Sequence, residues 1–192
     1  MKLGKTLYVS DRKSWREWLS KNYNKESEIW LIYYRKDSGK PRISYNDAVE
    51  EALCYGWIDS TIKSIDKESF AQRFSVRKKT SNLSQMNKER IYKLIAQKQM
   101  TKAGLAAISH VFDVAKDKEK SVTISPDILK PLKANKEAWE NFQSFPESYK
   151  RIRIAYIESR KRHGDDQFIK SLTHFINMTA KNKRIGFVKE MK

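Results

Sequence analysis

The nine residues Glu28–Lys36 constrain the fold of this chain more than any other stretch. Their sequence, EIWLIYYRK, is dominated by β-branched and aromatic side chains, which favour a β-strand. Alternate side chains point to opposite faces of a strand, and here both faces are apolar. Such a strand is expected at the centre of a sheet, with cover on both sides. The sequence therefore predicts a sheet against which other elements pack.

The spacing of apolar residues predicts the remaining elements. Shorter strands are expected at residues 7–9, 57–65 and 69–76, the last two forming a hairpin. Helices are expected from about residue 12 and over 44–55, 84–99, 101–112, 125–134, 135–143, 144–162 and 166–180. The predicted fold class is α+β: a small, mostly antiparallel sheet packed with helices, followed by an all-helical C-terminal part.

Two domains follow from this order of elements. Residues 1–120 would form the α+β domain, and residues 121–192 would form the helical C-terminal part. The charged run Asp113–Lys120 is the best candidate for the linker between them.

The chain is strongly basic, with 40 Lys and Arg against 23 Asp and Glu and a formal net charge of +17. This excess favours anionic partners, such as nucleic acid or phosphate groups, but it also fits lysines that simply solvate the surface. Acidic residues are scattered among the basic ones, which favours the second interpretation. Aromatic residues do not interleave with the basic runs as they do in RNA-binding modules.

The same composition indicates a cytoplasmic protein. A single cysteine excludes an intrachain disulfide and fits a reducing compartment. The N-terminal residues contain no apolar segment of the kind found in secretory signals. No apolar run approaches the length of a membrane span, so no span is expected.

Motifs for metals and familiar cofactors are absent from the sequence. His110, His163 and His174 lack the spacing of metal ligands, and neither a Walker A motif nor GxGxxG occurs. We therefore expect no metal and no cofactor. Cys54 falls in the last turn of a predicted helix, where the helix dipole raises the pKa of a thiol, so a small buried apolar residue is the favoured interpretation.

A possible anion site lies between the predicted hairpin and the helix that Ser84 begins. Asp59 is a carboxylate within a strand, and Arg73 or Arg77 on the neighbouring strand could pair with it. A structural ion pair is one interpretation. The other is a cleft with Asp59 on one wall and Arg73, Arg77, Ser81, Ser84 and the free N–H groups of the helix start on the other.

Several short motifs resemble the YdeI/OmpD-associated family, also called the bacteriocin-protection or OmdA family. They are EALCYGWID at 51–59, RFSVR at 73–77, SNLS at 81–84 with Asn87, and QKQMTKAG at 97–104. The similarity covers residues 5–110, and residues 125–145 resemble the start of the family's C-terminal helical part. The chain departs from the family pattern at Ser60, Val76 and Leu83, where Gly, Pro and Trp are usual.

The resemblance implies an uncharacterised cytosolic protein related to stress or to resistance against bacteriocins and antimicrobial peptides. The positions that match the family motifs, and so would mark a site, are Cys54, Trp57, Asp59, Arg73, Arg77, Ser81, Ser84 and Asn87. In our first hypothesis these residues, apart from Cys54, bind a small anion, with Trp57 as a wall and Asp59 as the orienting acid.

Three other roles stay open at this point. The chain could be an enzyme acting on a small anionic or phosphorylated metabolite, with Asp59 as its general base. It could associate with nucleic acid through its positive charge. A protein partner is the remaining possibility.

Overall fold

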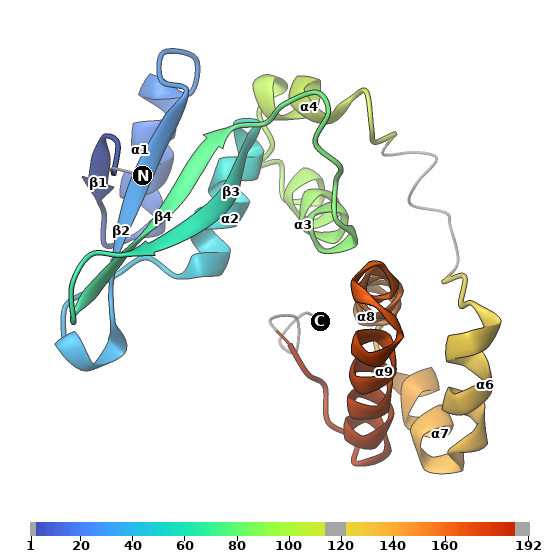
Figure 1. Ribbon diagram of the computed structural model, residues 1–192. Helices are drawn as coiled ribbons and strands as arrows, with labels where there is room; N and C mark the ends of the chain where they lie inside the picture. The colour runs from blue at the N-terminus through green and yellow to red at the C-terminus, as the bar shows by residue number, and fades with distance from the viewer. Residues whose placement is uncertain (1–2, 114–121, 187–192) are drawn as a thin grey trace. The chain divides into compact units, whose positions relative to one another are not determined.

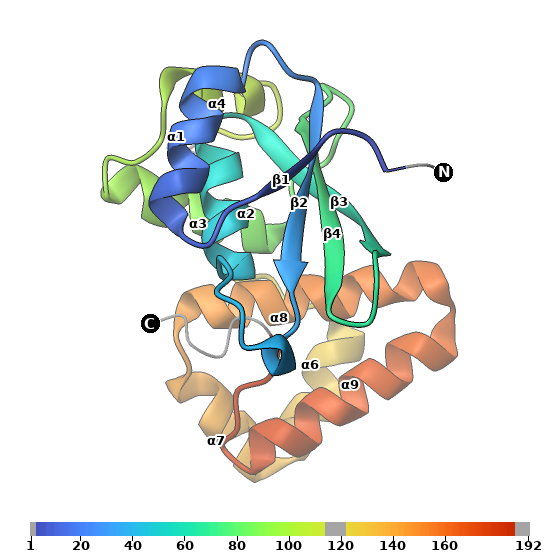
Figure 2. The ribbon, with the colours of Figure 1, turned by 90° about the vertical axis from the view of Figure 1, so that its left-hand side faces the viewer.

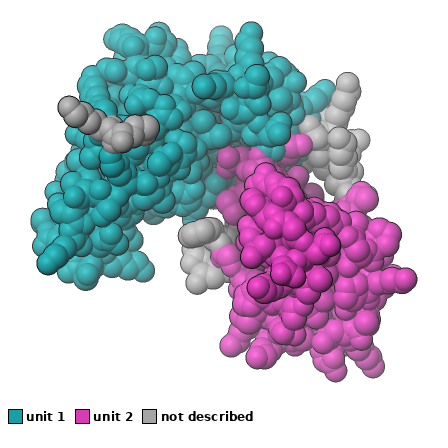
Figure 3. Space-filling view, in the orientation of Figure 1, with its two compact units in different colours: residues 1–83, 90–114 teal, residues 84–89, 115–192 magenta. Residues whose placement is uncertain are grey.

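The computed structural model describes residues 3–113 and 122–186. The chain divides into two compact units, coloured separately in Figure 3. The first comprises residues 1–83 and 90–114, and the second comprises residues 84–89 and 115–192. Residues 114–120 of the predicted linker lie outside the described part of the chain.

The first unit contains a four-stranded sheet whose strand order is β1-β2-β4-β3. Its strands are β1 (Thr6–Tyr8), β2 (Glu28–Tyr34), β3 (Trp57–Ser64) and β4 (Ser69–Val76). The pairs β2–β4 and β3–β4 are antiparallel, but β1 runs parallel to β2. The sheet is therefore mixed. The α+β class is confirmed, and the order of the strands places β2 inside the sheet as predicted.

Helices pack on one face of this sheet, as Figure 2 shows for α1, α2 and α4. These elements are α1 (Arg12–Asn22), α2 (Tyr45–Cys54), α3 (Gln85–Ala96) and α4 (Lys102–Ile108), with a short 3-10 turn, η1 (Lys36–Ser38). Their apolar stripes, such as Trp15 and Leu19 of α1 and Ile91 and Leu94 of α3, form one buried cluster with the sheet. Burial of this cluster is the main force that stabilises the unit.

The two apolar faces of β2 are covered in different ways. Ile29, Leu31 and Tyr33 belong to the cluster shared with the helices. Trp30 points to the other face and is only 1% exposed, although it is not part of that cluster. A Cβ atom on Gly4 would lie 3.4 Å from its indole ring, so the N-terminal segment packs beside it. Both faces are thus protected, but only one of them by helices.

The connection from α2 to β3 requires two glycines. Gly56 has φ of +77°, a left-handed conformation that favours glycine after a helix, and a Cβ there would lie 2.6 Å from the Ala107 side chain. A Cβ on Gly104 would lie 2.3 Å from the main-chain oxygen of Cys54. Helices α2 and α4 therefore approach at the point where the chain enters β3, and this contact fixes where the strand starts.

The second unit is helical among its described residues. It contains α6 (Pro126–Ala134), α7 (Lys136–Ser144), α8 (Glu147–Arg160), a 3-10 turn η2 (Lys161–His163) and α9 (Asp165–Ala180), all labelled in Figure 1 except η2. Helix α9 packs against both α7 and α8, and α6 packs against α7. A separate apolar cluster that includes Phe142, Tyr149 and Phe175 fills the interior. This arrangement confirms the predicted helices of the C-terminal part.

Candidate functional site

Asp59 lies in β3 directly opposite Phe74 of β4, so its side chain shares the face of the sheet that the helices cover. The hydroxyl of Tyr45, at the start of α2, donates a hydrogen bond of 2.7 Å to its carboxylate. Burial raises the pKa of Tyr45, and the negative charge of Asp59 raises it further. Tyr45 is therefore a neutral hydrogen-bond donor that holds Asp59 in place.

Arg73 is directed to the other face of the sheet. It lies opposite Trp30 in β2, one position away from the Asp59–Phe74 pair. Its guanidinium forms an ion pair with Glu28, with Nε donating to the Glu28 carboxylate over 3.0 Å. The nearby Arg73 lowers the pKa of Glu28 through this hydrogen bond. Arg73 is thus the partner of Glu28, and it does not join the Asp59 site.

Arg77 follows directly after β4 and is only 6% exposed. One terminal nitrogen donates to the main-chain oxygens of Ser81 and Asn82, at 3.3 and 3.2 Å. The Nε atom and the other terminal nitrogen are buried and have no hydrogen-bond partner. Burial lowers the pKa of Arg77, while the negative charge of Asp59 partly offsets that shift. Arg77 is therefore close enough to Asp59 for the carboxylate to affect its pKa.

A second buried arginine, Arg90 of α3, also belongs to this region and was missed in the sequence. It is 6% exposed and donates a 2.7 Å hydrogen bond to the side-chain oxygen of Asn46, the neighbour of Tyr45. Burial lowers its pKa, and the charges of Tyr45, Glu50 and Asp59 oppose that shift. No local pattern distinguishes Arg90 from the other basic residues of α3, because only the packing of α3 beside α2 buries it.

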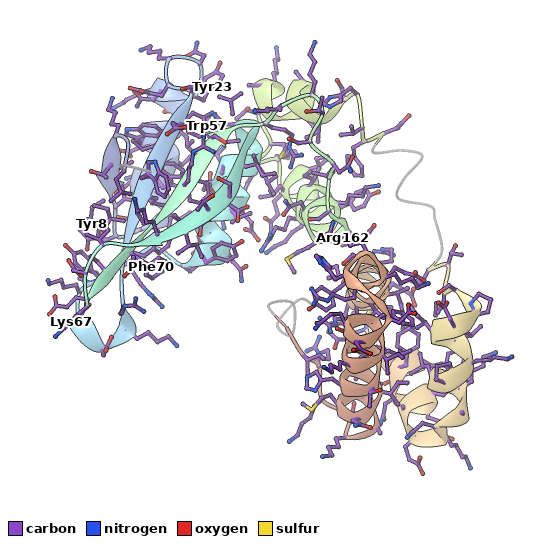
Figure 4. The ribbon with its side chains drawn as sticks, in the orientation of Figure 1. Tyr8, Tyr23, Trp57, Lys67, Phe70 and Arg162 are labelled. Carbon is purple, nitrogen blue, oxygen red and sulfur yellow. The ribbon has the colours of Figure 1, made fainter. Side chains whose placement is uncertain are left out.

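Trp57 and Ser81 take structural positions. The indole N–H of Trp57 donates 3.1 Å to the main-chain oxygen of Tyr23, and the two residues lie together in Figure 4. The ring is fully buried and meets Trp18 edge to face. Ser81 contributes its main-chain oxygen as an acceptor for Arg77.

Ser84 and Asn87 fall in the second compact unit, whereas Asp59, Arg77 and Arg90 fall in the first. The Ser84 hydroxyl accepts a 3.3 Å hydrogen bond from the main-chain N–H of Asn87, as expected for a residue that caps a helix. The structure thus groups Asp59 with Arg77 and Arg90, while Arg73 pairs elsewhere and Trp57 packs in the core.

Cys54 is fully buried at the end of α2. Burial raises the pKa of its thiol to about 11, and the negative charge of Glu51 acts in the same direction. A thiol with this pKa is protonated at neutral pH, which agrees with its interpretation as a small buried apolar residue.

Comparison with known protein families divides the chain near residue 115, where the two units also change over, although residues 84–89 of the second unit lie within the first match. Residues 121–182 match the family described as Bacteriocin-protection, YdeI or OmpD-Associated (OmdA). Residues 7–107, more than half of the chain, match a Domain of unknown function (DUF8412). The protein is therefore an α+β protein whose N-terminal part is a DUF8412 domain. Its helical C-terminal part, over residues 121–182, belongs to the YdeI/OmpD-associated family.

The family membership predicted from short motifs is thus confirmed, but through a different part of the chain. The motifs lie within residues 51–104, whereas the OmdA match covers the helical residues that resembled the family less closely. No curated protein and no solved structure matches the chain. Among the described residues, no helix has both the length and the apolar composition to cross a membrane, and no group of three potential metal-ligating side chains occurs there.

Proposed function

We propose that the DUF8412 unit of this bacteriocin-protection family protein binds a small anion through Arg77. The proposal rests on one observation: the guanidinium of Arg77 is buried, yet two of its three nitrogens have no acceptor. A buried N–H group without an acceptor costs about 1–3 kcal/mol, and more when the group is charged. An oxyanion placed against the free edge of the guanidinium would remove that cost with two parallel hydrogen bonds.

The charge balance of the site supports the same proposal. Burial lowers the pKa of both Arg77 and Arg90, and the negative charge of Asp59 opposes that shift in both, while Glu50 also acts on Arg90. The carboxylate of Asp59 therefore already offsets part of the positive charge at Arg77. A monoanion, such as a small carboxylate, suits this site better than a dianion, which the charge of Asp59 would oppose more strongly.

In this proposal the protein is a cytoplasmic member of the family whose anion binding serves resistance to stress or to bacteriocins. The residues in contact with the anion would be Arg77 and Arg90, and Asp59 with Tyr45 would orient them. If Asp59 instead acts as a general base, the same site would turn over a small anionic metabolite. A nucleic-acid role would depend on the basic surface and not on these residues.

A thermal-shift screen of the full chain tests the proposal. Formate, acetate, nitrate, phosphate and a short oligonucleotide are compared at constant ionic strength, because a ligand that binds only the folded state raises the melting temperature. We expect a saturable rise of about 5 °C with a small monoanion at ten times its dissociation constant.

Arg77→Met should abolish this rise, and Arg73→Met is the matched control. Arg73 lies four residues earlier, within β4, but pairs with Glu28 on the other face of the sheet, so its loss should leave the rise intact. An equal rise in Arg77→Met, or no rise with any anion, would disprove the Arg77 site. A rise with the oligonucleotide alone that salt abolishes would favour the nucleic-acid role.

A further inference from the structure

The OmdA unit contains a second arginine with unusual surroundings, Arg153 in the middle of α8. It is 8% exposed, and its Nε atom is buried without a hydrogen-bond partner. Its guanidinium lies 4.7 Å from the ring centre of Tyr156 and 5.8 Å from that of Phe175 in α9. Among the described residues, this guanidinium donates no hydrogen bond at all. Aromatic rings therefore flank Arg153, and no described residue supplies an acceptor for its donors.

Arg151, two residues earlier in α8, has a carboxylate partner, in contrast to Arg153. Arg151 meets the carboxylate of Glu89, also in the second unit, through two hydrogen bonds of 2.5 and 2.7 Å. Arg153 has no such carboxylate. Burial lowers its pKa, and only the phenol groups of Tyr149 and Tyr156 oppose that shift. A cation–π contact with an aromatic ring offsets less free energy than the cost of burying an unpaired charge.

The chain beyond α9 passes beside the same guanidinium. The main-chain N–H of Ile185 donates 2.9 Å to the hydroxyl of Tyr149, one turn before Arg153. Gly186 follows with φ of +83°, and a Cβ there would lie 3.1 Å from a terminal nitrogen of Arg153. Any other residue at this position would place its Cβ against that nitrogen, and the Tyr149 hydroxyl, which accepts from Ile185, can still donate its own proton.

We propose that Arg153 is the centre of a phosphate-binding site in the OmdA unit. A phosphate group would accept hydrogen bonds from the guanidinium edge beside Gly186 and from the hydroxyl of Tyr149. Among the described residues, no carboxylate contributes to the environment of Arg153, and the pKa of Tyr149 responds to the positive charges of both Arg153 and Arg184. A site with positive charges and no acid suits a dianion. This site lies within the second unit and does not depend on the site at Arg77.

The test uses the Nε–H signal of Arg153 in the nitrogen-15 NMR spectrum of the full chain. The Arg153→Met variant assigns the signal by its absence. Inorganic phosphate is the probe, and chloride and acetate at the same ionic strength are the comparison. We expect phosphate to shift this signal along a saturating curve with a dissociation constant in the millimolar range or below, and acetate to shift it at least tenfold less.

Arg162→Met is the matched control, because Arg162 is an exposed basic residue of η2, labelled in Figure 4, outside the proposed site. Its loss should leave the phosphate response of Arg153 unchanged. Arg153→Lys keeps the charge but loses the planar fork, and should weaken phosphate binding at least fivefold, measured by calorimetry. A linear response that phosphate and acetate share would overturn the proposal, as would unchanged phosphate affinity in both Arg153 variants. Because acetate binding at Arg77 is measured separately, either site can fail alone.

Discussion

The two units of this protein bury an arginine in opposite electrostatic settings. In the first unit Arg77 accompanies a second buried arginine, Arg90, and the charge of Asp59 acts on both. In the second unit Arg153 lies between the rings of Tyr156 and Phe175, with no acid in its environment. In our two proposals, the nearby acid limits the charge that a ligand can bring to Arg77, whereas no described acid limits it at Arg153. The comparison teaches that two buried arginines of one chain can lie in surroundings that favour different anions.

Two half-buried arginines elsewhere in the first unit, Arg12 and Arg16, are paired with carboxylates, and this contrast gives the largest expected effect. Glu51 is 1% exposed and accepts hydrogen bonds of 2.6 Å from both Arg12 and Arg16. Glu51→Gln should destabilise the protein by about 3 kcal/mol, because it removes the buried carboxylate that pairs with Arg16 and is one of the three carboxylates that pair with Arg12. Arg77→Met should lower the free energy of unfolding far less, because it removes a buried charge that already lacks hydrogen-bond partners on two of its nitrogens. Urea denaturation of both variants measures the difference. Similar losses in the two would show that Arg77 is satisfied without a ligand.

The comparison assumes that each unit keeps its structure without help from the other. Gly104→Ala places a Cβ 2.3 Å from the main-chain oxygen of Cys54 and should cost the first unit about 2–3 kcal/mol through overpacking. Hydrogen exchange read by mass spectrometry should show faster exchange in peptides from 28–76 and unchanged exchange in peptides from 126–180. Gly4→Ala is the control, because its Cβ would meet only side-chain atoms, at 3.2 Å or more. Faster exchange in both units would mean that they unfold together.

Removal of the acid should make the first site resemble the second. Asp59→Asn keeps the size of the side chain and its ability to accept from Tyr45, but removes the charge that opposes an anion. We expect acetate to bind about tenfold more tightly, and phosphate to gain more than acetate, as the Coulomb repulsion disappears. Calorimetric titration measures both affinities. Asp37→Asn, at an exposed carboxylate of η1, should change neither. Weaker acetate binding in Asp59→Asn would instead show that Asp59 mainly orients the arginines.

The smallest expected effect concerns Cys54 and depends on pH. Burial raises the pKa of its thiol to about 11, above the ordinary value of 9.0, so the folded state holds the proton more tightly than the unfolded chain. The resulting stabilisation is complete below about pH 9 and is lost as the pH rises through about 11. When the pH is raised from 8 to 10, the free energy of unfolding should fall in both proteins, but by about 1 kcal/mol less in Cys54→Ala than in the native protein. Urea denaturation at the two pH values measures this difference. Equal losses would show that the thiol does not titrate in this range.

Much of the fold could be predicted because it depends on local pattern. Ser44 caps α2 and Asp11 caps α1 through side-chain oxygens, as their positions before amphipathic stretches indicate. Gly56 ends the α2 segment with positive φ, as predicted from its place after the apolar stripe. The hairpin β3–β4 also follows from the two apolar runs and the polar turn between them. These features depend on neighbours within a few residues, so the sequence displays them directly.

Register and burial, in contrast, depend on contacts between distant residues. Arg73 pairs opposite Trp30 in β2, and this register decides which face of the sheet its side chain occupies. The sequence does not reveal the register, so it predicts Arg73 and Arg77 as equal candidates for a position beside Asp59. The parallel direction of β1 could not be derived either, because three residues carry no signal about the partner strand.

The sequence by itself determined the α+β class, the helical C-terminal part, the family and the stretch that contains Asp59 and Arg77. Only the tertiary structure decided that Arg73 pairs with Glu28, that Arg90 joins Asp59, and that Arg153 is buried without an acceptor. The physical reason is that an arginine looks the same in a sequence whether water, a carboxylate or an aromatic ring surrounds it. Its free energy depends on those surroundings, and they are supplied by residues far away along the chain.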